Sequence, residues 1–200
     1  MKLLKHYIYE AFKINKNIKL ESRYKYFPKT KEELINIIDK RIEAEGNECD
    51  LNDIDTSKIT DMSSLFKRSD FNGDISDWDV SNVTNMTGIF AVSKFNGDIS
   101  KWNVSKVKDM GSMFAYSVFN NDISSWNVYN VCNMPHMFMK SKFNQDISKW
   151  DVSNVKDMAW MFRRTSFNQD ISNWNVSNVT DYDGIFDNCP IEEKYKPKFI

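Results

Sequence analysis

A block of the form Phe-Asn-x-Asp-Ile-Ser-x-Trp recurs along the chain at a strict spacing of 24 residues. It begins at Phe71, Phe95, Phe119, Phe143 and Phe167. A fixed period of this length is typical of stacked repeats that bury a continuous core between neighbouring units. Such arrays present long surfaces, so the sequence says more about architecture than about a partner.

Each repeat is predicted to form a short strand, a tight corner and a short helix. In the second full copy, Trp102 and Val104 alternate with polar residues, which is typical of a strand. Val107, Met110 and Phe114 then follow at three- and four-residue steps, which is typical of one or two helical turns. We therefore predict an α/β fold, a right-handed leucine-rich-repeat-like solenoid of about six 24-residue coils with a parallel sheet and a helical N-terminal cap.

The repeats occupy the central part of the chain. Leu4, Ile8 and Phe12 stand at helical spacing in a basic segment that precedes them. Thr30 and Glu33 form a capping box, which predicts the start of a helix that covers the first repeat. The predicted parts are a basic amphipathic head and connector, a helical cap, the repeat solenoid, and a C-terminal cap or tail, at residues 1–29, 30–46, 47–190 and 191–200.

Charge is distributed unevenly along the chain. The formal net charge is -1, but residues 1–31 hold nine Lys or Arg against two Glu, so the remainder carries -8. A basic head on an acidic body indicates that the head has a role of its own. We favour docking of its apolar helix face over nucleic-acid binding, which basic residues interleaved with aromatic ones would also allow.

Residue types that carry catalysis or hold metals are sparse. Cys49, Cys132 and Cys189 stand outside any metal-binding spacing, and the chain has two histidines, so we expect no cofactor and no zinc site. Cys132 and His136 stand at a helical i,i+4 step, but no orienting acid accompanies them. A repeated column of aspartates favours turns that hold backbone amides, with calcium as the alternative. Its members are Asp74, Asp98, Asp122, Asp146 and Asp170.

The sequence also bears on location. No apolar run is long enough to span a bilayer, and the opening residues lack the features of a signal peptide or a lipobox. Unpaired cysteines favour a reducing compartment. We therefore expect a cytoplasmic protein, with virion association as the alternative, and we favour a monomer.

Residues that differ from their equivalents in the other copies are the best guide to function in the sequence, because residues that only build the scaffold recur in every copy. On the expected helix side, one column holds Gly88 and Ser112 in the early copies but His136 and Trp160 in the third and fourth. On the expected strand side, Tyr129 replaces a serine. Trp, Arg and Met are enriched at protein interfaces. The candidate partner-binding residues are Tyr129, His136, Met139, Lys140, Trp160, Arg163 and Arg164.

The longer unit Phe-Asn-x-Asp-Ile-Ser-x-Trp-Asp/Asn-Val-Ser-Asn-Val-x-x-Met-x-x-Met/Ile-Phe resembles the repeat of the BspA-like leucine-rich-repeat proteins. That group was first catalogued as a mycoplasma protein family of unknown function. The resemblance extends over residues 50–190 and implies a leucine-rich-repeat-like solenoid with interaction or adhesion roles. Residues 1–12 are also similar to short leader-like segments on proteins of large AT-rich bacteriophages.

These features lead to one favoured hypothesis. We expect a non-enzymatic protein–protein interaction module that is phage-encoded and acts on a host or virion protein. The alternative is a cell-surface adhesin-type repeat protein, and a metal-dependent hydrolase is less favoured. Nucleic acid is not the expected partner, and the sequence leaves the identity of the protein partner open.

Overall fold

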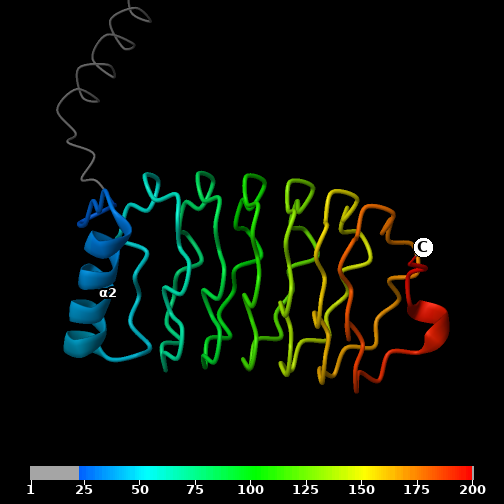
Figure 1. Ribbon diagram of the computed structural model, residues 1–200. Helices are drawn as coiled ribbons and strands as arrows, with labels where there is room; N and C mark the ends of the chain where they lie inside the picture. Colours follow the sequence, from blue (N-terminus) through cyan, green and yellow to red (C-terminus); the bar gives the residue numbers. More distant parts are fainter. Residues whose placement is uncertain (1–22, 200) are drawn as a thin grey trace, which may run out of the picture.

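The computed structural model describes residues 23–199, in which the repeats lie side by side as irregular loops of chain (Figure 1). The helix α2, Lys31–Glu45, lies at one end of the stack, and the 3-10 turn η1, Glu193–Tyr195, lies at the other. Single parallel bridges join equivalent positions of successive repeats. They link Asp61, Asn85, Asp109, Asn133, Asp157 and Asp181 in one line. The 24-residue period therefore sets which residues become neighbours.

The predicted fold class, an α/β right-handed leucine-rich-repeat-like solenoid with a parallel sheet, is wrong. The described residues hold one α-helix, one 3-10 turn and isolated bridges, and no sheet. The repeats themselves contain neither the strand nor the helix that the pattern of apolar residues predicts. Tight turns replace both.

The segment expected to be helical has a different hydrogen-bond pattern. The N–H of Phe114 donates to the carbonyl of Met137 in the next repeat at 2.9 Å. A helix requires that bond to run to the residue four positions earlier in the chain. Ser112 and Tyr116 have φ values of 55° and 58°, in the left-handed region that an α-helix excludes. The three- and four-residue spacing thus reflects tight turns whose alternate N–H groups join one repeat to the next.

The segment expected to be a strand consists of two consecutive turns. Trp102 N–H donates to Ile99 O at 3.1 Å, and Val107 N–H donates to Val104 O at 2.9 Å. Trp102 and Val104 are buried while Lys101 and Asn103 are exposed, so the alternation predicted burial correctly. Side chains connect the repeats here, since the indole N–H of Trp126 donates to Ile99 O at 3.1 Å. The backbone therefore forms no ladder on this side.

Stacked aromatic rings fill the interior. The ring of Phe90 lies 4.2 Å from that of Phe95 and 5.8 Å from that of Phe114 in the next repeat, measured between centroids. Trp126 and Trp150 stack at 6.5 Å. These rings are all buried, and burial of each contributes about 1.5–3 kcal/mol. The predicted columns of Phe and Trp are confirmed by these contacts.

The N-terminal end of the stack is covered by α2. The hydroxyl of Thr30 accepts a hydrogen bond from the N–H of Glu33 at 3.2 Å, as the capping box predicts. Leu34 and Ile38 are the buried residues of the helix and belong to the same core as the repeats. The helix covers residues that the first repeat would otherwise expose. The predicted amphipathic helix of the head lies outside the described residues.

The C-terminal end of the stack is covered by the last residues of the described chain. Ile191 is buried, and Tyr195 O accepts a hydrogen bond from Ile171 N–H at 3.0 Å. The ring of Phe199 stacks on that of Tyr182 at 4.4 Å between centroids. Tyr182 stands in the column that other repeats fill with a buried methionine. This segment therefore packs as a cap.

Candidate protein-interaction surface

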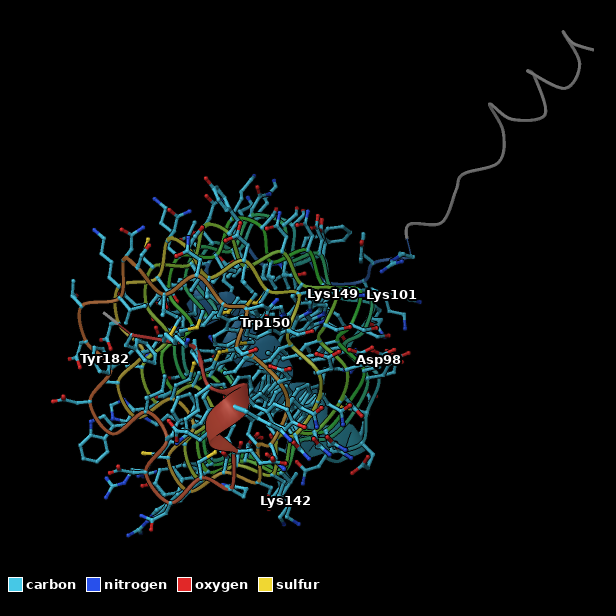
Figure 2. The ribbon with its side chains drawn as sticks, turned by 90° about the vertical axis from the view of Figure 1, so that its right-hand side faces the viewer. Asp98, Lys101, Lys142, Lys149, Trp150 and Tyr182 are labelled. Atoms are coloured by element: carbon cyan, nitrogen blue, oxygen red, sulfur yellow. The ribbon has the colours of Figure 1, made fainter. Side chains whose placement is uncertain are left out.

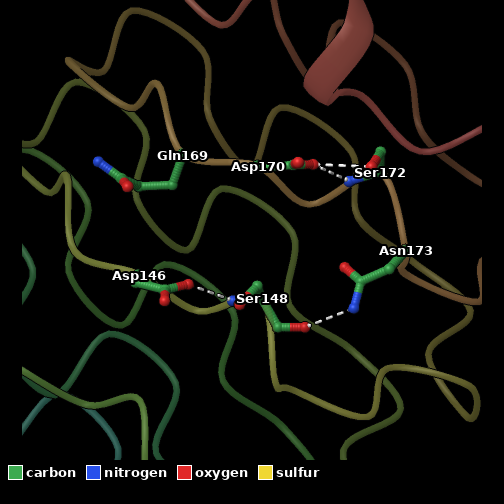
Figure 3. A pocket seen from close by; sticks show the side chains of 6 residues that line it. All are labelled: Asp146, Ser148, Gln169, Asp170, Ser172 and Asn173. Carbon is green, nitrogen blue, oxygen red and sulfur yellow. Dashed lines mark hydrogen bonds between the residues drawn. The ribbon is translucent and has the colours of Figure 1, made fainter.

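The repeated polar columns stabilise the backbone of the stack. Asn120 Oδ1 accepts a hydrogen bond from the N–H of Asn144 at 2.8 Å, and the other members of this column repeat the contact. Asp146 Oδ1 accepts the N–H of Ser148 at 2.9 Å (Figure 3). That backbone hydrogen bond holds the pKa of Asp146 below its ordinary value. The aspartates serve as turn residues, as the pattern predicts.

A pocket between neighbouring repeats is lined by these same groups (Figure 3). Asp170 Oδ1 accepts from both the N–H and the hydroxyl of Ser172, and Asn173 donates to Ser148 O at 3.1 Å. Each of these contacts fixes a turn or joins two repeats. Among residues 23–199, no group of three His, Cys, Asp or Glu residues is placed to hold a metal ion.

Cys132 and His136 are not joined by a hydrogen bond in the structure. The thiol of Cys132 lies 3.7 Å from Asn130 O, and the ring of His136 packs on that of Trp160 with centroids 6.0 Å apart. The helical step that would have aligned them is absent, because their segment forms turns. The arrangement therefore does not support a thiol nucleophile with a histidine base.

Six of the seven predicted partner-binding residues lie together, and we call them the Trp160 patch. The guanidinium carbon of Arg163 lies 4.1 Å from the centroid of the Trp160 ring, a distance typical of a cation–π contact. Arg163 Nε also lies 3.9 Å from Asp187 Oδ2. The Trp160 ring thus contacts both an imidazole and a guanidinium. The patch comprises His136, Met139, Lys140, Trp160, Arg163 and Arg164.

Tyr129 lies in a different part of the repeat from the patch. Its side chain is 50% exposed, and its backbone N–H donates to Asn127 Oδ1 at 3.2 Å. Its carbonyl accepts from the Asn154 side chain at 2.8 Å. The sheet face on which Tyr129 was predicted to stand does not exist. Tyr129 therefore stands in the two consecutive turns that contain Trp126 and Val131, a different segment of the repeat from the other six candidates.

The Trp160 patch lies towards one end of a longer row of residues that runs along the stack. The N–H of Tyr116 donates to Met139 O at 2.7 Å, and that of Lys140 donates to Arg163 O at 2.8 Å. The same bond repeats in every repeat, so one residue of each stands in a continuous line. The φ values in this line lie between 53° and 60°. Its members are Arg68, Val92, Tyr116, Lys140, Arg164 and Asn188.

The residues around this line are basic and partly apolar, and we call the whole feature the basic edge. Seven Lys or Arg accompany two Asp, a local charge of +5 on a body that carries -8. Val92, Tyr116 and Val118 are 47%, 46% and 38% exposed. Its basic members are Lys67, Arg68, Lys94, Lys140, Lys142, Arg163 and Arg164, and its acidic members are Asp70 and Asp187.

Figure 2 shows how the basic edge lies relative to other surfaces. Viewed along the stack, Lys142 projects at one corner, whereas Asp98, Lys101 and Lys149 lie on another side. Trp150 lies in the interior between them. Asp98, a member of the exposed aspartate column, therefore lies on a different side of the stack from Lys142. Lys101 and Lys149 lie on the same side as the aspartates, so that side carries both charges.

Comparison with known families identifies the repeat. The family described as Mycoplasma protein of unknown function, DUF285, matches residues 37–142 and again residues 115–196. The chain belongs to the DUF285 family. No curated protein matches it, and no solved structure does. The sequence resemblance to a mycoplasma repeat family is confirmed at this level. In the described part of this DUF285 chain, no helix is long and apolar enough to cross a membrane.

Sequence reasoning found half of the edge in this DUF285 chain and missed the other half. It compared columns that become large in the third and fourth copies, so it selected the patch. Val92, Tyr116 and Val118 stand in columns that vary in every repeat, so they did not contrast with a constant residue. The sequence did contain one sign of the turns that form the edge: Gly88 and Gly184 stand at the same position of the repeat as Trp160. Glycine in that column indicates a positive φ and thus an irregular turn.

Proposed function

We propose that this chain is a non-enzymatic protein-interaction module that binds its partner through the Trp160 patch. The observation that carries the proposal is the grouping of Trp160, Arg163 and His136 on one edge of an otherwise repetitive stack. Trp and Arg supply a large share of binding energy at protein interfaces. The surrounding backbone is fixed by bonds between repeats, so the patch is preorganised.

Two further observations support a binding role. Membership of a repeat family fits a surface built for contacts, and the likeness of the repeat to BspA-like proteins implies interaction or adhesion. The polar groups of the described pocket in Figure 3 hold turns together, which leaves the patch as the better candidate for function.

We place the partner inside the cell, and a host or virion protein is the class that we favour. The supporting observation is that Cys49, Cys132 and Cys189 are free thiols, which are typical of a reducing compartment. Fractionation of the cells that produce the protein tests this proposal. Recovery of the native protein at the cell surface would favour the adhesin alternative.

An affinity pull-down from those cells tests the patch. The variant is Trp160→Gly/Arg163→Ala/Arg164→Asn, in which each new residue already stands in the same column of another repeat. These substitutions should remove the patch while they preserve the fold. The matched control is Lys101→Ala/Tyr129→Ala/Lys149→Ala, three exposed residues outside the patch. We expect the patch variant to lose the partner and the control to retain it. Equal recovery of the partner by the patch variant would remove the patch from consideration.

A further inference from the structure

We propose that the basic edge binds an extended acidic segment of a protein partner, with acidic residues towards both ends and an apolar residue in the middle. This inference rests on the proposed function and names the chemistry of the partner.

The length of the edge suits a short extended chain. Backbones that are joined by hydrogen bonds lie about 4.8 Å apart, so the line from Arg68 to Arg164 spans about 19 Å. An extended polypeptide rises about 3.3 Å per residue, and about six residues would therefore follow the line. The line is unbroken, because Val92 N–H also donates to Ala115 O at 2.7 Å.

The order of side chains predicts the order of groups in the ligand. Cations stand at both ends of the edge, with Lys67, Arg68 and Lys94 near the first repeat and the patch near the last. The middle repeat is apolar, since Tyr116 and Val118 are exposed there, and Val92 adjoins them in the repeat that also carries Lys94. Lys140 Nζ lies 4.9 Å from the centroid of the Tyr116 ring, so cationic and apolar parts adjoin. An acidic–apolar–acidic segment complements this order.

The same order of charged and apolar side chains argues against a nucleic acid or another long polyanion as the ligand. Two carboxylates interrupt the positive charge near the ends, where Asp70 pairs with Lys94 at 3.0 Å and Asp187 lies 3.9 Å from Arg163. A nucleic acid would carry a phosphate against the uncharged middle as well. Stacking of successive bases needs several aromatic faces, but Tyr116 stands between the aliphatic Val92 and Val118, and the Trp160 ring already contacts His136 and Arg163.

The backbone conformation in this line of residues supports a role in binding. Val92 is β-branched and has φ 58°, which is an outlier for such a residue. Asn188, at the end of the same line, is a residue type that tolerates this conformation well. The positive φ recurs in every repeat and is enforced by the scaffold, so the choice of a β-branched residue at this position is what needs an explanation. Exposed valine at such a position contributes little to the core and is better explained by a contact with a partner.

Selection of random short peptides against the full chain tests the inference. We expect enriched peptides to carry Asp or Glu on both sides of an apolar residue within about six positions. The selected peptide is then titrated against charge-reversal variants. Arg68→Glu/Arg164→Glu should weaken binding by about tenfold or more. Lys101→Glu/Lys149→Glu changes the net charge equally on another side and should leave affinity as it is (Figure 2).

Several results would overturn this inference. Selection without enrichment of acidic residues would do so, as would equal affinity of the Arg68→Glu/Arg164→Glu variant. Oligothymidylate and phosphatidylserine vesicles are compared at the same salt concentration. Tighter binding of either one through Arg68 and Arg164 would assign the edge to nucleic acid or to membrane. The proposed function would survive these results, because the pull-down does not depend on an acidic segment.

Discussion

Replacement of Trp126 by alanine should destabilise the stack strongly. The Trp126 side chain is 4% exposed and its ring lies 6.4 Å from that of Phe114 and 6.5 Å from that of Trp150. Truncation of such a buried ring costs about 3–5 kcal/mol. The indole also donates to Ile99 O, which still accepts the N–H of Trp102 in the variant. The lost hydrogen bond therefore adds only about 1 kcal/mol.

The expected total is a loss of about 5 kcal/mol in the free energy of unfolding, which lowers the melting temperature by about 10–20 °C for a chain of this size. Thermal unfolding followed by circular dichroism measures this shift. Trp126→Phe keeps a ring and should lose about 1–2 kcal/mol. Trp160→Gly removes a tryptophan from the surface and should cost less than about 1 kcal/mol. A Trp126→Ala variant that melts like the wild type would refute the core assignment.

Three further predictions concern the turns. Asn120→Ala leaves the N–H of Asn144 without its partner and should lower the urea midpoint by an amount equivalent to about 1 kcal/mol. The backbone hydrogen bond from Ser124 holds the pKa of Asp122 low. The ionised Asp122 therefore stabilises the fold above the ordinary Asp pKa of about 4, and this stabilisation is lost as the pH falls below that value. Urea midpoints measured against pH should fall in that range, and less steeply for Asp122→Asn; an unchanged acid limb would be inconsistent with this role. Val92→Asn should raise stability by about 1 kcal/mol while it weakens peptide binding, and a loss of stability would argue against backbone strain.

The core and the caps were predictable because they depend on which side chains are apolar. A strict period places equivalent residues side by side, so the columns of Phe and Trp followed from spacing alone. The capping box at Thr30 and Glu33 likewise defined α2 locally. Neither inference required knowledge of where the backbone hydrogen bonds of the repeat run.

The fold class was not predictable from the same pattern. Apolar residues at three- and four-residue steps suit an α-helix and also suit consecutive tight turns. The difference lies in whether Phe114 N–H donates backwards along the chain or across to Met137. Side-chain polarity does not encode that choice. The basic edge was half missed for a related reason, since exposure of Val92 and Tyr116 depends on left-handed turns that the expected helix would not contain.

Photocrosslinking inside the producing cells tests the central claim most directly. A photoreactive benzoylphenylalanine replaces Tyr116 in one variant and Tyr129 in a matched one, since both tyrosines are about half exposed but lie on different parts of the repeat. The account predicts a crosslink to one protein partner from the position of Tyr116, within an acidic segment of that partner, and none from the position of Tyr129. A crosslink from Tyr129 alone would contradict the assignment of the basic edge as the binding surface.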